Sequence, residues 1–245
     1  GIAWFCCKCA RRSIIVERLR CNCSQAARAI YRIIDGGINM KPLSKETPVT
    51  IVCYGDSNTK YYLGDLQQDG PQENSYPNKL QELFWEHDFQ QVRVLNCGFP
   101  DTQTDFAVAN FQQQVVDNQA DICIFGFGTN CVRQPDADLE DYLDDMAHLF
   151  SLCKQRNIQP MCLMIPWFAE DYCGLEGQMR LPGWNSALCE LCLTRNIPLI
   201  DTYGTFSGDP DLFFSEVETP KRHYSAEATS VVAQMAFSMM KPYIR

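Results

Sequence analysis

The stretch Val49-Thr-Ile-Val-Cys-Tyr54, followed at once by Gly55-Asp56-Ser57-Asn58, decides the fold of this chain. Its first part is a continuous apolar run rich in β-branched residues, which is typical of a strand buried on both faces of a sheet. Its second part consists of turn-forming residues, so a polar loop follows the strand directly. The pattern predicts a central strand with a polar turn at its carboxyl end.

Four further apolar runs of the same kind follow along the chain, at residues 92–96, 122–127, 161–165 and 197–201. Segments with the spacing of amphipathic helices lie near residues 75–88, 104–118, 137–156, 184–195 and 225–242. Strands that alternate with helices of this length indicate a parallel sheet covered on both faces. We therefore expect one three-layer α/β/α sandwich with a five-stranded parallel sheet, of the flavodoxin-like class.

The composition supports one large domain and excludes several classes of protein. The chain has 245 residues, of which 46% are hydrophobic and 21% charged, enough to bury a substantial core. It contains no apolar run of about eighteen residues, so we expect no membrane span. The formal net charge of −9 disfavours a nucleic-acid partner, because phosphate binding needs basic surface.

The fourteen cysteines are unevenly distributed, with five of them in the first 23 residues (Cys6, Cys7, Cys9, Cys21 and Cys23). The others lie singly, mostly inside apolar stretches such as residues 121–125 and 160–164. Cysteines in such positions are typical of small buried side chains in a reducing compartment rather than of a disulfide framework. We expect the protein to be cytoplasmic.

Residues 1–39 differ from the rest of the chain, with seven basic and two acidic residues. A secretory signal is disfavoured, because the apolar run Ser13-Ile-Ile-Val is too short. A zinc site is disfavoured too, because the gaps between paired cysteines are zero or one residue instead of two. Asp35-Gly-Gly shortly before Met40 can be encoded by a purine-rich sequence like a bacterial ribosome-binding site. We therefore predict that residues 1–39 are a translated upstream leader and that residues 40–245 form the domain.

The carboxyl ends of the predicted strands are where a fold of this class binds its ligands. Ser57 lies in the turn after the first strand. A nucleophilic serine needs an exposed hydroxyl, a base within hydrogen-bond reach, and donors aimed at the developing oxyanion. The Gly-Asp-Ser-Asn stretch is equally compatible with an ordinary turn, so Ser57 alone decides nothing.

The candidate base is found by elimination, because the chain has only three histidines. His87 and His148 lie in predicted helical segments, away from the carboxyl ends of the strands. His223 follows a loop and precedes the last predicted helix, which suits a base that reaches a serine on the first strand. Asn130, which follows the third strand, could donate its amide to an oxyanion, or it could cap a helix or form an Asx-turn.

Together these motifs resemble the SGNH (GDSL-type) hydrolase family. Gly55-Asp56-Ser57-Asn58 resembles its first block, Gly128-Thr129-Asn130 its third, and His223-Tyr-Ser-Ala-Glu-Ala its last. Trp184-Asn185 and Ile197-Pro-Leu-Ile-Asp201 also resemble the segment before the last block, so the resemblance covers about residues 48–243. It implies that Ser57 is the nucleophile, that His223 is the base and that the Asn130 amide helps to form the oxyanion hole.

The chain departs from the family pattern at three positions. Asp101 stands where the second block usually has a glycine whose backbone N–H points into the oxyanion hole. Cys131 follows Asn130 in place of the usual aspartate. Pro220 stands where the family has the acid that supports the histidine, so Glu218 becomes the possible acid partner of His223. A backbone carbonyl could also support the imidazole, which would make the site a dyad.

The resemblance implies a serine esterase that hydrolyses a carboxylic ester with a small acyl or acetyl group. Its expected partner is a small-molecule ester, neutral or cationic because of the acidic surface, and no metal or organic cofactor is implied. The alternative is a catalytically impaired acyl- or carbohydrate-binding module, which the altered positions 101 and 220 would explain. The acyl and alcohol specificity and the oligomeric state stay open.

Overall fold

The structure is a computed structural model that describes residues 42–63, 66–214 and 222–244. The predictions for residues 1–39, for Glu218 and for Pro220 fall outside the described residues. The domain boundary predicted near Met40 falls outside them as well.

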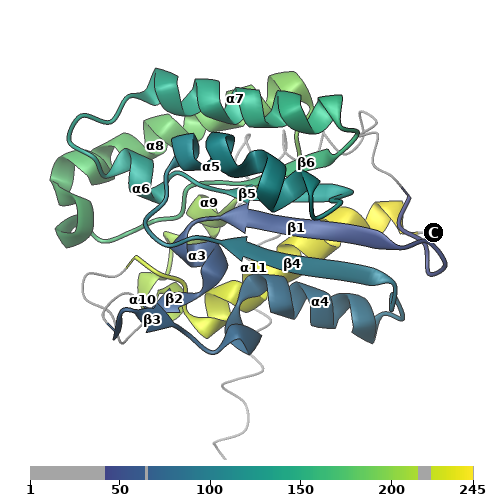
Figure 1. The fold of residues 1–245 in the computed structure, drawn as a ribbon. Coiled ribbons are helices and arrows are strands. Elements are labelled where there is room, and N and C mark those ends of the chain that lie inside the picture. The colour runs from purple at the N-terminus through teal and green to yellow at the C-terminus, as the bar shows by residue number, and fades with distance from the viewer. Residues whose placement is uncertain (1–41, 64–65, 215–221, 245) are drawn as a thin grey trace, which may run out of the picture.

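The core of the domain is a parallel sheet of five strands, as predicted (Figure 1). In chain order they are β1 (Val49–Gly55), β4 (Val92–Gly98), β5 (Ile122–Gly126), β6 (Gln159–Leu163) and β7 (Leu199–Ile200). Their order across the sheet is β4-β1-β5-β6-β7, and each neighbouring pair is parallel. This is the flavodoxin-like order, in which the chain reverses direction across the sheet between β1 and β5.

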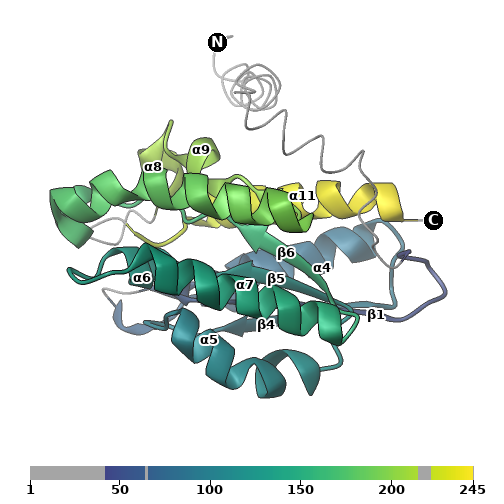
Figure 2. The ribbon, with the colours of Figure 1, turned by 90° about the horizontal axis from the view of Figure 1, so that it is seen from above.

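Helices cover both faces of the sheet, which explains why the strands are continuously apolar. One face packs against α4 (Tyr76–Glu86) and α11 (Ala226–Met240). The other face packs against α5 (Thr104–Phe111), α7 (Leu139–Gln155) and α8 (Glu170–Arg195) (Figure 2). Alternate residues of β1 serve the two cores: Ile51 belongs to the first and Val52 to the second. The expected three-layer arrangement is confirmed.

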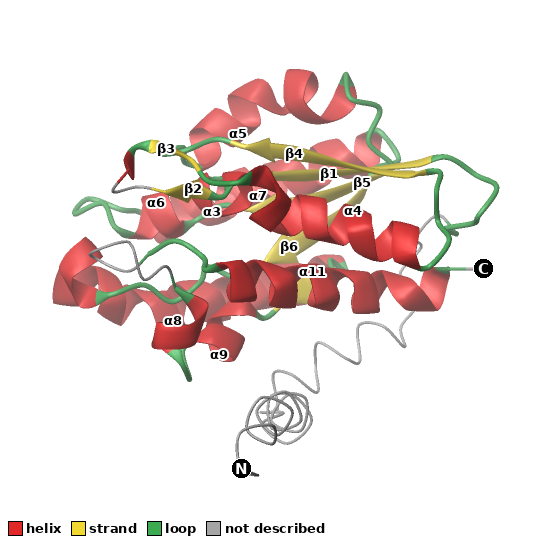
Figure 3. Cartoon of the chain, turned by 90° about the horizontal axis from the view of Figure 1, so that it is seen from below, coloured by secondary structure: helices red, strands yellow, loops and turns green. Residues whose placement is uncertain are grey.

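Short elements connect the main ones and differ from the predicted pattern in places (Figure 3). The largest difference from the predicted helices is in α8. This helix begins at Glu170 rather than near residue 184, and it contains Pro182 and a kink at Gly174. The segment predicted as a helix over residues 104–118 is α5 followed by the π-helical η3 (Gln112–Val116). The remaining elements are the hairpin β2 (Tyr62–Leu63) and β3 (Gln68–Asp69), the turns η2 (Gln72–Asn74) and η4 (Lys241–Tyr243), and the short helices α3 (Ser57–Lys60), α6 (Thr129–Val132), α9 (Thr202–Phe206) and α10 (Pro210–Phe213). In the part of the chain that the structure describes, no helix is long and apolar enough to cross a membrane.

At the carboxyl edge of the sheet, the backbones of β1, β4 and β5 lie close together. Gly55 at the end of β1 lies in register with Gly98 of β4 and Gly126 of β5. A Cβ atom on Gly55 would lie 2.7 Å from the carbonyl oxygen of Gly126, so no larger residue fits there. The backbone N–H of Asp56 donates to that same carbonyl at 3.1 Å. The turn that carries Ser57 therefore starts from a fixed point between three strands.

The turn after β4 contains a backbone conformation that favours glycine. Asp101 has a φ of 58°, in the left-handed region. The turn is closed by the hydroxyl of Thr102, which donates to the carbonyl of Phe99 at 2.8 Å. Aspartate tolerates this region better than most residues but less well than glycine. The observed φ explains why a glycine would suit this position.

We expect Asp101→Gly to raise the free energy of unfolding by up to about 1 kcal/mol, because glycine adopts a positive φ at no steric cost. For a domain of this size the melting temperature would rise by roughly 2–4 °C. Asp101→Ala is the matched control, since it removes the same carboxylate but keeps a Cβ at the positive φ. It should lower the melting temperature. Equal melting temperatures for the two variants would contradict the role given to the backbone here.

Candidate active site

Ser57 is the first residue of α3, directly after the turn that ends β1. The side chain of Asp56 caps this short helix, since its carboxylate accepts from the N–H of Asn58 at 2.9 Å. Ser57 is only 6% exposed. Its hydroxyl is therefore held in a nearly closed setting at the carboxyl edge of the sheet.

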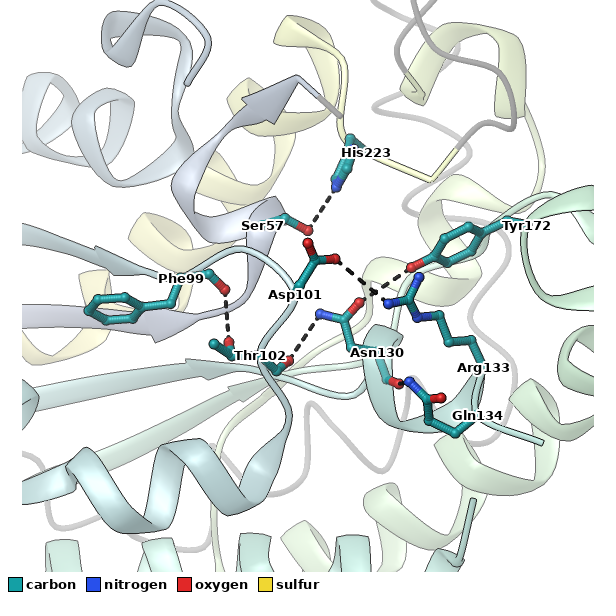
Figure 4. A network of polar contacts seen from close by, with 9 residues as sticks. All are labelled: Ser57, Phe99, Asp101, Thr102, Asn130, Arg133, Gln134, Tyr172 and His223. Atoms are coloured by element: carbon teal, nitrogen blue, oxygen red, sulfur yellow. Dashed lines mark hydrogen bonds and ion pairs between the residues drawn. The ribbon is translucent and has the colours of Figure 1, made fainter. Parts of the chain in front are cut away.

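His223 reaches Ser57 from the other end of the chain. Its Nε2 lies 2.7 Å from the Oγ of Ser57, although 166 positions separate the two residues (Figure 4). His223 is also 6% exposed, and the ring of Tyr62 meets its imidazole edge to face with centroids 6.2 Å apart. The structure thus places the late histidine beside the serine that follows the first strand.

Asn58 fixes the backbone on both sides of His223. Its Nδ2 donates to the carbonyl of Arg222 at 3.3 Å, and its Oδ1 accepts from the N–H of Tyr224 at 2.9 Å. Both contacts are made by one buried side chain next to Ser57. The serine and the histidine are therefore positioned by the same short helix.

Asn130 lies in α6, just beyond the carboxyl end of β5, and is 2% exposed. It does not cap its helix, because the cap position belongs to Gly128, whose φ is 134°. Instead, its Nδ2 donates to the carbonyl of Thr102 at 3.0 Å, and its Oδ1 accepts from the hydroxyl of Tyr172 at 3.3 Å (Figure 4). Its side chain thus connects the loops after β4 and β5 with α8.

Asp101 lies on the open side of this group. Its side chain is 81% exposed, and a carboxylate oxygen lies 3.7 Å from Nη2 of Arg133. An exposed pair at this distance contributes little to stability. In the view of Figure 4, Asp101 lies between Ser57 and Arg133.

Two buried groups near Ser57 have strongly shifted pKa values. Burial raises the pKa of Asp56 to about 6, although the N–H of Asn58 and the neighbouring His223 and Thr129 act in the opposite direction. Burial also raises the pKa of the Cys131 thiol to about 11. Cys131 is therefore a neutral thiol near neutral pH and no competitor to Ser57 as a nucleophile.

A small cavity lies beside the turn that carries Ser57, at the carboxyl ends of β1 and β5. Its lining includes Asp56, Asn58, Gly126, Thr129 and Tyr224. Within the described ranges, no three histidine, cysteine or acidic side chains are grouped so that they could hold a metal ion. The arrangement offers a hydroxyl, an imidazole and an amide. Acyl transfer uses such groups as nucleophile, base and oxyanion donor.

The structure brings together the predicted residues Ser57, His223, Asn130 and Asp101, while Glu218 lies outside the described residues. Four residues around this group were not predicted from the sequence. Arg133 and Tyr172 contact Asp101 and Asn130, and the side chain of Asn58 bonds the Arg222 carbonyl next to His223. Asn58 could have been found, because it belongs to the same short block as Ser57. Tyr172 could not, because it lies in a segment whose position no local pattern determines.

The chain is similar to one known family of proteins. The model of the GDSL-like Lipase/Acylhydrolase family matches residues 53–229. None of the curated proteins compared with the chain matches it.

Three solved structures illustrate the fold. The lipase/acylhydrolase from Enterococcus faecalis is 18% identical with a TM-score of 0.69, over 80% of this chain and 97% of that one. An acetylxylan esterase from Geobacillus stearothermophilus is 15% identical with a TM-score of 0.66, over 84% and 99%. A putative lipolytic protein of the G-D-S-L family from Desulfitobacterium hafniense DCB-2 is 18% identical with a TM-score of 0.61, over 78% and 99%.

The family match includes the end of β1, Ser57, Asn130 and His223, and it extends over most of the described domain. The resemblance noted in the sequence is thereby confirmed. The chain belongs to the GDSL-like lipase/acylhydrolase family and is an ester hydrolase.

Proposed function

We propose that this ester hydrolase is a serine esterase that removes a small acyl group, such as acetyl, by a Ser57–His223 mechanism. The observation that carries the proposal is the 2.7 Å separation between Oγ of Ser57 and Nε2 of His223. A general base must lie within about 2.6–3.2 Å of the proton that it removes. The pair meets this requirement.

The mechanism follows from that contact. Nε2 of His223 takes the proton of the Ser57 hydroxyl as Oγ attacks the carbonyl carbon of the ester. The tetrahedral intermediate collapses to an acyl-serine, and the leaving alkoxide takes the proton from the imidazolium. A water molecule then gives its proton to His223 and attacks the acyl-serine. The carboxylic acid leaves, and Ser57 regains its proton.

The oxyanion of the intermediate needs donors that are in place before the reaction. We assign this role to the Nδ2 of Asn130 and to the backbone N–H groups of Ser57 and Asp101. Asn130 gives one hydrogen to Thr102, so its second hydrogen stays available for the oxyanion. Removing one such donor in other serine hydrolases costs on the order of 10²–10³-fold in kcat.

The closed setting favours a small acyl group. Ser57 and His223 are each only 6% exposed, so a compact acyl group reaches the hydroxyl more easily than a bulky one. The structural neighbours include acetylxylan esterases, whose names state that they act on acetyl esters. Both observations support a small-molecule acetyl ester as the substrate.

The first test uses the nucleophile itself. A fluorophosphonate probe should label Ser57, and the label should vanish in Ser57→Ala and in His223→Ala. Hydrolysis of 4-nitrophenyl acetate should fall by on the order of 10⁴-fold or more in both variants, because neither residue acts without the other. Within a series of acyl lengths, kcat/KM should be highest for acetate.

His148→Ala, in the middle of α7, is the matched control and should keep its label and its turnover. Labelling of another serine, or equal turnover by Ser57→Ala, would contradict the assignment. A wild-type protein that binds acetyl esters without hydrolysing them would favour a binding module instead.

The second test concerns the group that holds the far nitrogen of His223. A fully extended Glu-Thr-Pro-Lys-Arg-His run would place Glu218 about 16 Å from His223, at about 3.3 Å for each of five residue steps. We therefore favour a dyad supported by a backbone carbonyl over a Ser57–His223–Glu218 triad. Glu218→Gln should lower kcat less than tenfold. A loss on the order of 10⁴-fold, as when the acid of a serine protease triad is removed, would establish the triad.

The third test concerns pH. Because burial raises the pKa of Asp56 to about 6, the folded state favours the protonated carboxyl. Its contribution to stability is complete below the unfolded pKa near 4 and is lost as the pH rises through about 6. The loss amounts to about 3 kcal/mol from a shift of roughly two pKa units.

Asp56→Asn keeps the oxygen that caps α3 but cannot ionise, so it should not show this loss. Denaturant unfolding of both proteins at pH 4, 5, 6 and 7.5 would measure the difference. The stability of the wild type relative to Asp56→Asn should fall between about pH 4 and pH 6 and level off by pH 7.5. A constant difference, or one that grows in favour of the wild type, would show that Asp56 is not penalised by burial.

A further inference from the structure

Tyr172 lies near the start of α8, where it contacts the candidate oxyanion donor. Its hydroxyl donates to the Oδ1 of Asn130 at 3.3 Å (Figure 4). A kink at Gly174, where φ is 70°, separates this first turn from the rest of the helix. The kink lets the first turn follow its own direction, so that Tyr172 meets Asn130.

The ring of Tyr172 is held from several sides. The guanidinium carbon of Arg133 lies 5.2 Å from the ring centroid, and that of Arg222 lies 4.8 Å from it. The ring of Phe168 meets it nearly at right angles at 5.6 Å. Arg133 directly follows α6, which carries Asn130, and Arg222 immediately precedes His223. The ring is thus fixed by the same two segments that carry the base and the oxyanion donor.

The carbonyl of Thr102 selects the orientation of the Asn130 carboxamide, because it can only accept, and the hydroxyl of Tyr172 holds the amide there by donating to Oδ1. Rotating the amide by 180° would set Oδ1 against the Thr102 carbonyl, where two acceptors repel each other. Only the observed orientation satisfies both partners, and it keeps the second N–H of Nδ2 available for the oxyanion.

We propose that Tyr172 is a positioning residue, whose hydroxyl fixes the carboxamide of Asn130 in the orientation that stabilises the oxyanion. This inference rests on the function proposed above and adds to it a residue that acts through Asn130. It also gives a role to the first turn of α8, since that turn delivers the hydroxyl to the site.

The hydroxyl remains a donor over the working range of an esterase. Burial raises the pKa of Tyr172 to about 12, with the two arginines acting in the opposite direction. The neutral phenol therefore keeps its proton at neutral pH. Its contact with Asn130 adds no charge beside the developing oxyanion.

The decisive variant is Tyr172→Phe, which removes the hydroxyl and keeps the ring between the two arginines. We expect kcat for 4-nitrophenyl acetate to fall about five- to tenfold, as for the loss of one neutral hydrogen bond. KM should change less than twofold, because the amide matters most after the oxyanion has formed. Tyr203→Phe, which changes a partly buried tyrosine of α9, is the matched control and should keep its kcat.

A double-mutant cycle separates positioning from general damage. In the background of Asn130→Ala, adding Tyr172→Phe should lower kcat no further, because the hydroxyl has lost the group through which it acts. The same fold-loss in both backgrounds would overturn the proposal. An unchanged kcat for the single variant Tyr172→Phe would overturn it too.

A spectroscopic measurement keeps this inference distinct from the proposed function. The side-chain NH₂ signals of Asn130, assigned by their loss in Asn130→Ala, should shift or broaden in Tyr172→Phe and stay in place in Tyr203→Phe. Signals that do not respond to Tyr172→Phe would overturn the positioning role even in an active enzyme. A wild type without turnover and without a Ser57 label would overturn the function instead, and the amide signals would still report on the contact.

Discussion

The side chain of Asn58 makes two hydrogen bonds, one donated and one accepted, that join α3 to the segment before the last helix. One reaches the carbonyl of Arg222 and the other the N–H of Tyr224, so both act on the backbone around His223. Because Asn58 is the neighbour of Ser57 in α3, any shift of the turn moves both sides of the Ser57–His223 contact together. The 2.7 Å separation between Ser57 and His223 therefore depends on the buried amide of Asn58 as well as on the two residues themselves.

The parts of the fold that follow a local pattern could be predicted from the sequence. Continuous apolar runs correctly indicated the strands, because a strand covered on both faces needs no polar side. The start of α8 was missed because Gly174 and Pro182 are residues that usually interrupt helices. The hairpin β2–β3 was missed because strands of two residues carry no detectable alternation. These features are set by tertiary packing.

The site could be predicted in part for a related reason. Ser57 and Asn130 follow neighbouring parallel strands, whose carboxyl ends must meet at one edge. His223 was found because few histidines compete with it. Tyr172 was beyond reach, since nothing in its neighbourhood indicates which loop it contacts. The leader at residues 1–39, the cytoplasmic location and the role of Glu218 remain predictions.

The long separation between Ser57 and His223 has a consequence for how the enzyme matures. Strand β1 finds its neighbours β4 and β5 within residues 49–126, so the turn with Ser57 can form before the segment with His223 is made. The base arrives 166 positions later, just ahead of α11. Until the ribosome has released that segment, the serine has neither its proton acceptor nor the backbone partners of Asn58. If Ser57 and His223 act as proposed, a nascent chain that lacks the segment around His223 would not hydrolyse an ester.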